Sequence, residues 1–542
     1  MVKLAGLASN RGRNLRRLDE IAPGGAELAV VATNREGAPV VEAASERGIP
    51  TEVIEREDGE TRADHERRLL DRLDPYDFDL VCLDGYMRVL TDEFLDRAPT
   101  TLNVHPSLLP AFPGANAHEE ALEAGVRTSG CTVHVVTEEV DSGPIVTQEP
   151  VPVYEDDDEA TLKRRVLERA EYVAYPRAVR WFAEDRVSVE RDDGGRPVDV
   201  TVQGDVDDAF PERRLASSDR VRTLRYGENP HQESAVYADP TCDEPSVVSA
   251  EQRNEDAKAL SYNNYNDADA ALRLVREFEE PAAGVIKHAN PAGCATADAL
   301  SDAYDRALRT DAKSAFGGIV ALNRTCDVET AERIVDSFKE VVVAPGYTDG
   351  AVDVLSERSD LRVLDVGEFG GGSTDGTTPG GADRAPMTEK PIVGGRLLQE
   401  RDEWSPTAQD LEIVTERAPT DAEVETMLFA WKTLKHVKSN GIVFATGTET
   451  VGLGVGQVSR IDAVNIAAMK AQTDADGKSA DGAVMASDAF FPFPDGIEDA
   501  AEAGIEAVIQ PGGSVNDADV IEAADDHGMA MALTGRRCFR HD

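Results

Sequence analysis

The feature that most limits the possible folds is the alternation of short apolar segments and helix-like segments over residues 1–180. The apolar segments are LAGLA, ELAVVAT, TEVIE, FDLVCLDG and TLNVHP, and each has the length and composition of a β-strand. Helix-like stretches such as Ala38–Glu46 and Arg62–Leu73 lie between them. Strands that alternate with helices form a parallel sheet covered by helices. The first part of the chain is therefore predicted to be a doubly wound α/β domain.

Three polar side chains in this region, Asn103, His105 and Asp141, form a frame that suits acyl transfer to an amine. Asn103 and His105 alternate along an extended segment, so both point to one face, and Pro106 ends that segment. Ligand sites open at such strand ends in parallel α/β sheets. Asp141 follows a second strand-like run, Cys131–Val136, and its carboxylate can orient the imidazole or relay a proton. The alternative is a turn-rich loop with one structural histidine.

The chain carries a large excess of acidic residues. Its 103 Asp and Glu residues outnumber its 56 Lys and Arg residues, which gives a formal net charge of −47 at pH 7, and only 12 of the basic residues are lysines. We expect such a surface in a high-salt cytoplasm, where ions screen the repulsion between carboxylates. The same charge argues against a nucleic-acid partner, because phosphate binding needs clustered basic side chains.

Composition also limits the compartment and the classes of site. Six cysteines are scattered without a CxxC pair, which argues against a zinc site and for a reducing interior. No run of 18 apolar residues exists, so no membrane partner is expected. The first residues show no signal-peptide pattern. We therefore expect a cytoplasmic protein without a metal site.

A polar segment separates two predicted domains. Residues 185–219 are rich in Asp and Gly and are predicted to be a linker with at most one or two loose strands. The domains are accordingly residues 1–184 and 220–542. In the second, residues 367–385 are rich in Gly and Thr and are predicted to form an exposed loop. No internal repeat with a short fixed period is visible.

The motifs NVHPSLLPAFPG and GCTVHVVTEEVDSGP, within residues 103–144, resemble glycinamide ribonucleotide (GAR) formyltransferases. The resemblance implies a Rossmann-like domain. It also implies that Asn103, His105 and Asp141 are catalytic and transfer a formyl group from 10-formyltetrahydrofolate to GAR.

The same resemblance implies further binding residues. Gly12 and Asn14 match a phosphate-binding turn between a strand and a helix, and Glu171 matches an acidic position that contacts the substrate. In the segment GYMRVL, Arg88 and Val89 match positions that bind the folate. The turn departs from the family, since Asn10, Arg11 and Arg13 stand where Gly, Asn and Ser are usual.

Residues 220–542 carry a second series of motifs, in the order LRYGENPHQ, LSYNN, VIKHANPAG, SAFGGIVALNR, LKHVKSN, GVGQVSRID, ASDAFFPFPDG, QPGGS and TGRRCFRH. Together they resemble the transformylase half of the bifunctional enzyme that formylates aminoimidazole carboxamide ribonucleotide (AICAR). The resemblance implies an α/β domain with cytidine deaminase-like subdomains. Lys287 and His288 follow an apolar strand-like run, and a bend at Asn290–Pro291 is expected to help their side chains converge.

Residue roles in this second region are implied by the resemblance alone. Lys287, His288 and Asn440 match catalytic positions. The matched substrate-binding positions are Arg225, Tyr226, His231 and Arg537, and Asp495 matches a folate-binding position.

The two resemblances together imply one chain with two folate-dependent formyl transfers and no IMP cyclohydrolase region. They also imply a homodimer formed through residues 220–542 and leave a monovalent cation (K⁺) site possible. The alternative is that only the AICAR half is active, and that the first half is a folate-binding scaffold or a formyltetrahydrofolate hydrolase.

Overall fold

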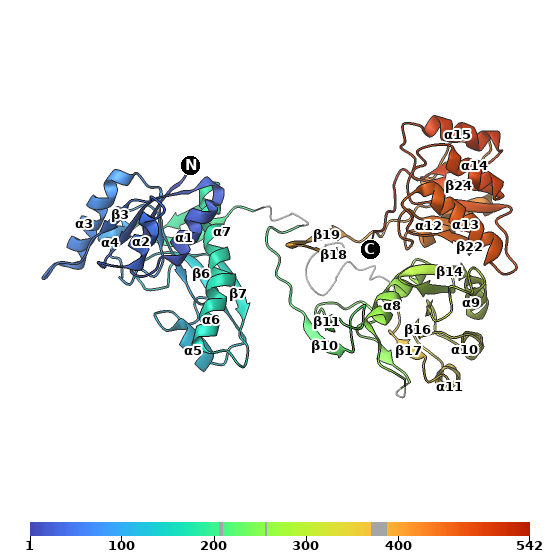
Figure 1. Ribbon diagram of the computed structural model, residues 1–542, viewed down its shortest axis with the longest axis horizontal. Coiled ribbons are helices and arrows are strands. Elements are labelled where there is room, and N and C mark those ends of the chain that lie inside the picture. Colours follow the sequence, from blue (N-terminus) through green and yellow to red (C-terminus); the bar gives the residue numbers. More distant parts are fainter. Residues whose placement is uncertain (205–209, 255–256, 370–386, 542) are drawn as a thin grey trace. The chain divides into compact units, whose positions relative to one another are not determined.

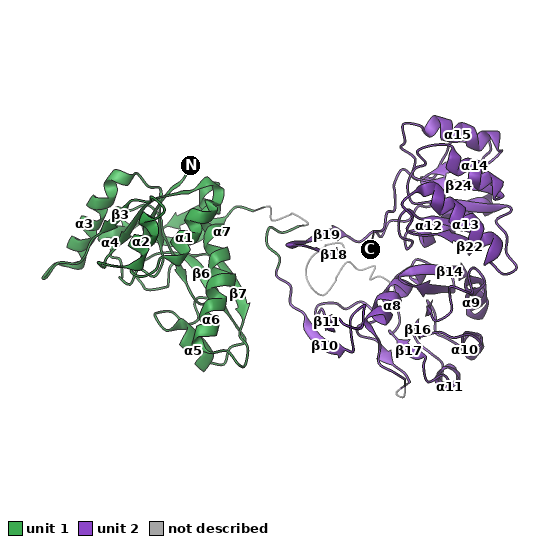
Figure 2. Ribbon diagram, viewed as in Figure 1, with its two compact units in different colours: residues 1–214 green, residues 215–542 purple. Residues whose placement is uncertain are grey.

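The protein is described by a computed structural model that covers residues 1–204, 210–254, 257–369 and 387–541 (Figure 1). Two compact units are present, Met1–Arg214 and Leu215–Asp542 (Figure 2). Most of the predicted Gly- and Thr-rich loop, residues 370–385, lies outside the described residues. Among the helices of the described ranges, none has the length and apolar character that crossing a membrane needs.

Unit 1 is built on one seven-stranded sheet with the strand order β3-β2-β1-β4-β5-β6-β7. The first five strands in this order are parallel, and β6 and β7 run antiparallel at one edge. This arrangement confirms the predicted doubly wound α/β domain. The strands are β1 (Lys3–Leu7), β2 (Glu27–Thr33), β3 (Thr51–Val53), β4 (Leu80–Leu83), β5 (Thr101–His105), β6 (Thr128–Val135) and β7 (Ile145–Pro152).

Helices pack on both faces of this sheet and close two apolar clusters, one on each side. Helix α3 matches the predicted stretch because Thr61 caps its first turn and its apolar residues lie on one buried face. The helices are α1 (Arg13–Ile21), α2 (Pro39–Ser45), α3 (Arg62–Leu73), α4 (Asp92–Leu95), α5 (Ala117–Glu123), α6 (Glu159–Val166) and α7 (Tyr172–Ala183).

A π-helical turn, Leu167–Glu171, joins α6 to α7. Such a turn accommodates one extra residue within a helix, and it is frequent at functional sites. In this chain it places Glu171 at the start of α7, on the wall of the unit 1 pocket.

The predicted linker contains regular structure. A hairpin of β8 (Val187–Arg191) and β9 (Pro197–Val202) forms within it. Four partly buried valines of this hairpin pack against the core of unit 1. The predicted linker is therefore attached to unit 1 as far as Val202. The boundaries of the two domains, at residues 184 and 220, remain a prediction.

Unit 2 contains two copies of one arrangement along a twelve-stranded sheet. In each copy a helix leads into an antiparallel hairpin, and three helix–strand pairs follow. The hairpin's first strand pairs antiparallel with the third strand, and the later strands are parallel. The two hairpins meet at the centre of the sheet through β14 and β22. Two subdomains, as the resemblance implied, are visible in this arrangement.

The first copy comprises α8 (Tyr262–Val275), β13 (Ala282–Lys287), β14 (Asn290–Thr296), α9 (Leu300–Leu308), β15 (Ile319–Leu322), α10 (Val328–Val335), β16 (Val341–Ala344), α11 (Asp349–Ser356) and β17 (Arg362–Asp365). The second comprises α12 (Asp421–Leu434), β21 (Ile442–Thr446), β22 (Glu449–Gly454), α13 (Arg460–Thr473), β23 (Ala483–Ser487), α14 (Asp495–Glu502), β24 (Ile505–Gln510), α15 (Asp517–Asp526) and β25 (Ala530–Leu533).

Short strands and hairpins complete unit 2. The edge strands of the large sheet are β12 (Glu251–Gln252) and β20 (Glu412–Ile413). Two separate hairpins are formed by β10 (Asp219–Leu224) with β11 (Ser234–Ala238), and by β18 (Met387–Ile392) with β19 (Gly395–Glu400).

Candidate active sites

A pocket of about 810 Å³ opens at the carboxyl ends of β1, β4 and β5 in unit 1. Ligand sites are expected at this edge of a parallel sheet. Every site residue that the sequence predicted for this unit lines the pocket, namely Gly12, Asn14, Arg88, Val89, Asn103, His105, Asp141 and Glu171. The tertiary structure therefore gathers into one cavity residues that lie up to 159 positions apart in the sequence.

Asn103 is held by a histidine on the neighbouring strand. Antiparallel pairing sets Asn103 of β5 opposite His134 of β6, and Asn103 Nδ2 lies 3.1 Å from His134 Nε2. His134 Nδ1 lies 3.2 Å from the carbonyl oxygen of Val135, so a ring with its hydrogen on Nδ1 satisfies both contacts. Asn103 then donates one amide hydrogen to His134 and keeps the second for a ligand in the pocket.

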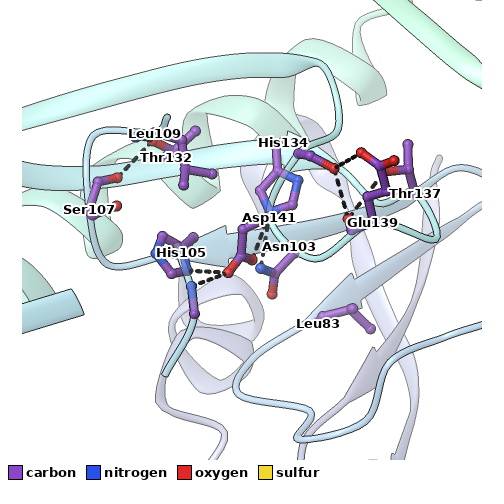
Figure 3. Close-up of polar contacts among 12 residues, drawn as sticks. Leu83, Asn103, His105, Ser107, Leu109, Thr132, His134, Thr137, Glu139 and Asp141 are labelled. Carbon is purple, nitrogen blue, oxygen red and sulfur yellow. Dashed lines mark hydrogen bonds and ion pairs between the residues drawn. The ribbon is translucent and has the colours of Figure 1, made fainter. Parts of the chain in front are cut away.

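His105 lies between two acceptors. Its Nε2 is 2.8 Å from the carbonyl oxygen of Phe112, and its Nδ1 is 3.2 Å from Asp141 Oδ2. A carbonyl and a carboxylate can only accept, so a ring protonated on both nitrogens satisfies both contacts. Figure 3 shows the carboxylate of Asp141 lying between the rings of His105 and His134.

Asp141 is kept ionised at this position. Burial alone would raise the pKa of its carboxyl group, but the backbone N–H of Gly114 at 2.8 Å and the charge of His105 hold the pKa below its ordinary value. Asp141 itself has a left-handed backbone with φ of 53°. Its carboxylate is therefore a fixed negative charge beside two imidazoles.

The turn between β1 and α1 fits glycine and little else at its centre. Gly12 has φ of 54°, and a Cβ atom there would lie 2.3 Å from Val40 Cγ2. The backbone N–H groups of Asn14 and Leu15, in the first turn of α1, already donate to the carboxylate of Asp84 at 2.7 and 3.4 Å. A phosphate cradle was expected at this turn; two of its helix N-terminal donors are occupied by a protein carboxylate, so only the remaining donors of the turn are open to a ligand.

Glu171 lies beside this turn and accepts a hydrogen bond of 2.6 Å from Asn14 Nδ2. Burial raises the pKa of Glu171 to about 7, which outweighs the opposing effect of that hydrogen bond, and the negative charge of Asp84 raises it further. Near neutral pH this carboxyl group is poised between its two protonation states. Arg88 and Val89 follow β4 and lie at the exposed mouth of the pocket.

Sequence reasoning did not assign Asp84, His118 or His134 to the site, although their side chains also line this pocket. His134 alternates with valines in the apolar strand around it, and Asp84 ends an apolar run, so a polar residue in a strand-like segment was the available signal. His118 is buried, and burial together with the charge of Lys163 lowers its pKa to about 4. Its imidazole is therefore neutral near pH 7.

A second pocket, of about 510 Å³, lies in unit 2 and is lined by Lys287 and His288. Lys287 ends β13, and its Nζ donates to the carbonyl oxygen of Gly317 at 3.0 Å. The chain reverses directly afterwards, because His288 and Ala289 both have left-handed backbones, with φ of 54° and 58°. The expected bend at Asn290–Pro291 is thus wrong in position, since those residues already belong to β14.

A carboxylate from α8 supports this reversal. Asp267 accepts hydrogen bonds from the backbone N–H groups of His288 at 3.2 Å and Ala289 at 2.7 Å. Left-handed backbone is costly for residues with a side chain, so these bonds offset part of that cost. The reversal leaves the ring of His288 exposed beside the pocket, while the stem of Lys287 is partly buried.

The remaining predicted residues of unit 2 do not line this pocket within the described ranges. The guanidinium groups of Arg225 and Arg537 lie over the rings of Tyr226 and Phe539, at 4.7 and 4.9 Å. His231 lies exposed in the loop before β11, and Asp495 lies exposed at the first position of α14. The structure therefore brings Lys287 and His288 together and leaves these residues on the surface of the single chain.

Asn440 has both ends of its amide engaged. Its Nδ2 donates to the carbonyl oxygens of Gln457 and Val458 at 2.9 and 3.0 Å, and its Oδ1 accepts from Arg460 at 2.8 Å. A role of this amide toward a formyl oxygen, which the resemblance implied, would require one of these bonds to be exchanged. Within the described residues, no group of three or more His, Cys, Asp or Glu side chains is arranged to hold a metal ion.

Comparison with known families matches both units. Residues 2–179 match the formyl transferase family, and residues 198–470 match the family described as AICARFT/IMPCHase bienzyme. Two curated relatives are both named bifunctional purine biosynthesis protein PurH. The one from Magnetococcus marinus is 49% identical over 340 residues, which cover 61% of this chain and 62% of that protein. The one from Paracoccus denitrificans is 48% identical over 352 residues, which cover 64% of each.

The chain thus spans less than two thirds of the length of these relatives. Among solved structures, glycinamide ribonucleotide transformylase 1 from Symbiobacterium toebii is 40% identical, with 38% of this chain and 95% of that chain covered and a TM-score of 0.35. The bienzyme family model covers half of the 542 residues. With a formyl transferase domain in its first unit, the chain belongs to the AICARFT/IMPCHase bienzyme family.

Proposed function

We propose that this chain carries two formyl transfers of purine biosynthesis, each with 10-formyltetrahydrofolate as co-substrate. Unit 1 formylates GAR and unit 2 formylates AICAR. The observation that carries the first assignment is the convergence of Asn103, His105 and Asp141 on one pocket. The second rests on Lys287 and His288 at the reversal beside the unit 2 pocket.

The unit 1 pocket suits a folate in size and lining. Its volume of about 810 Å³ lies within the range of pockets that enclose a ligand of that size. Arg88 and Val89 lie at its mouth, and in this proposal they hold the folate, mostly through backbone groups. When bound, 10-formyltetrahydrofolate supplies an electrophilic formyl carbon.

The protein groups around the formyl carbon are already arranged to stabilise the negative charge that develops on the formyl oxygen. The free amide hydrogen of Asn103 can donate to an oxygen that gains negative charge. The doubly protonated ring of His105 adds a positive charge nearby, and Asp141 fixes the orientation of that ring. Asp141 Oδ1, which lies 3.7 Å from His134 Nε2, is the atom through which a proton can be exchanged with the pocket.

At the other end of the pocket, Gly12, Asn14 and Glu171 bind the ribonucleotide part of GAR in this proposal. Gly12 permits close approach of the backbone, because a side chain there would collide with Val40. Arg11 and Arg13 line the same pocket and supply positive charge for the phosphate.

In unit 2, His288 accepts a proton from the attacking amine and Lys287 supports the developing negative charge. Asn440 assists at the formyl oxygen. Exposed residues complete the site when a second copy is present, so we propose a homodimer through residues 220–542. These exposed residues are Arg225, His231, Arg537 and Asp495, together with the half-buried Tyr226. A cytoplasmic location and a K⁺ site belong to the same proposal.

The test is to assay both reactions on the full-length chain with His105→Ala and His288→Ala. We expect His105→Ala to lose GAR formylation and keep AICAR formylation, and His288→Ala to show the reverse. Loss of both activities in either variant would mean that the two sites are not separate. A wild-type chain that only hydrolyses 10-formyltetrahydrofolate in unit 1, or only binds it, would support the alternative in which the AICAR half alone transfers formyl.

A further inference from the structure

A half-buried carboxylate organises the substrate end of the unit 1 pocket. Asp84 follows β4 directly, and its two oxygens face the beginning of α1. Oδ2 accepts from the backbone N–H groups of Asn14 and Leu15, and Oδ1 accepts from the side-chain Nδ2 of Asn14 at 3.2 Å. One carboxylate therefore fixes both the helix start and the side chain of Asn14.

The amide of Asn14 has only one favourable orientation in this setting. Its Nδ2 lies within hydrogen-bond distance of two carboxylates, Asp84 at 3.2 Å and Glu171 at 2.6 Å. The ionised carboxylate of Asp84 can only accept, so the amide nitrogen of Asn14 must face it, and Glu171 Oε2 accepts from the same nitrogen. The Oδ1 atom of Asn14 has no hydrogen-bond partner among the described residues, although Asn14 is buried and lines the pocket. A buried acceptor without a donor is costly, so it requires a partner from outside the chain.

The charges around Asp84 are few and can be named. Arg13 lies on the same turn and lowers the energy of the ionised carboxylate. Glu171, the last residue of the π-helical turn before α7, interacts with it unfavourably, while Tyr175 of α7 donates its hydroxyl to the carbonyl oxygens of Leu83 and Leu102. Burial raises the pKa of Asp84, and its three hydrogen bonds oppose that effect.

We propose that Asp84 is a positioning residue for substrate binding in unit 1: by orienting the amide of Asn14, it presents an acceptor oxygen to a hydroxyl or amine of the ribonucleotide. The inference rests on the proposed GAR formylation and names how that substrate is recognised. Asp84 acts through Asn14, because each of its two oxygens accepts a hydrogen bond from that residue.

The substitution Asp84→Asn separates this role from simple helix capping. Asparagine is as good as aspartate at a helix N-terminus, so a role limited to the N–H groups of Asn14 and Leu15 would be preserved. In contrast, an asparagine cannot accept from both the backbone and the Asn14 side chain without placing one N–H₂ group against another donor. The Asn14 amide would then lose its fixed orientation.

The experiment uses the full-length chain and measures the KM and kcat of GAR formylation, and the Kd of GAR by calorimetry. We expect Asp84→Asn and Asp84→Ala each to raise KM and Kd for GAR about tenfold, the usual scale for one lost hydrogen bond, with kcat changed less than about twofold. Asp79→Asn is the matched control, because Asp79 lies at the opposite end of β4 and, among the described residues, its carboxylate accepts only from the backbone N–H of Lys3, at 2.8 Å. It should change none of these values.

The double variant Asp84→Ala/Asn14→Ala provides the second test. If Asp84 acts through Asn14, the double variant should bind GAR no more weakly than Asn14→Ala alone. Additive losses, or a wild-type Kd for GAR in Asp84→Asn, would overturn the proposal. If the wild-type chain formylates no GAR at all, the proposed function fails first and the inference falls with it, and this outcome is distinguishable from a defect seen only in the variants. Should Asp84→Ala fail to fold, the comparison of Asp84→Asn with Asp79→Asn still decides.

Discussion

The substitution Asp141→Asn is the most direct test of the unit 1 site. It removes one negative charge and leaves the size of the side chain almost unchanged. The carboxylate lies 3.2 Å from His105 Nδ1 and 3.7 Å from His134 Nε2, so its charge acts on both rings. An ion pair about 4 Å apart contributes about 4 kcal/mol at an effective dielectric constant of about 20. Since 1.4 kcal/mol corresponds to a tenfold change in rate, loss of this interaction can lower the rate of GAR formylation by up to about a thousandfold.

We therefore expect Asp141→Asn to lower kcat for GAR formylation by about a hundredfold to a thousandfold. The assay follows formylation of GAR and of AICAR in the same preparation, so the AICAR rate reports the amount of intact unit 2. Glu139→Gln is the matched control, because it makes the same change of charge in the same pocket and Glu139 has no contact with either histidine among the described interactions. Equal losses in both variants, or a wild-type rate in Asp141→Asn, would refute the reasoning.

Four further predictions extend to the rest of the chain. Lys287→Ala and His288→Ala should each lower AICAR formylation by at least about a hundredfold and weaken AICAR binding less, which steady-state kinetics will check. In unit 1, the folded-state pKa of Glu171 is raised to about 7, so the folded state binds more protons than the unfolded state between about pH 4.5 and 7, and stability falls as pH rises through that window. The fall in the free energy of unfolding over this window should be on the order of 1 to 3 kcal/mol, and Glu171→Gln should abolish it. Denaturant unfolding at several pH values will check this, and an unchanged pH dependence in the variant would contradict the raised pKa of Glu171. Folding and both activities should require molar salt, because the Debye length shortens from about 8 Å at 0.15 M to about 3 Å at 1 M and the net charge is −47; identical circular dichroism melts in low and molar salt would exclude this. Sedimentation in molar salt should show a dimer, and dilution should reduce AICAR formylation while GAR formylation persists; a monomer active in both reactions would rule out a shared site.

Much of the secondary structure of unit 1 was predictable because its signals are local. The strand ELAVVAT and the helix Arg62–Leu73 have the predicted bounds, since alternation of apolar residues and a threonine cap both act within a few positions. The frame of Asn103, His105 and Asp141 was also visible in the sequence. Its first two members share one face of β5, and the third lies in the loop between β6 and β7.

The sequence alone determined the order of segments, the acidic surface and the residue types available for chemistry, because these are properties of neighbouring positions. The tertiary structure decided which of those residues meet. Antiparallel pairing of β6 with β5 sets His134 beside Asn103. Packing of α8 near the end of β13 brings Asp267 within hydrogen-bond distance of the backbone N–H of His288. Contact between the end of β4 and the start of α1 joined Asp84 to Asn14, 70 positions apart. Such contacts depend on how strands and helices pack over long sequence separations, and no local pattern encodes them.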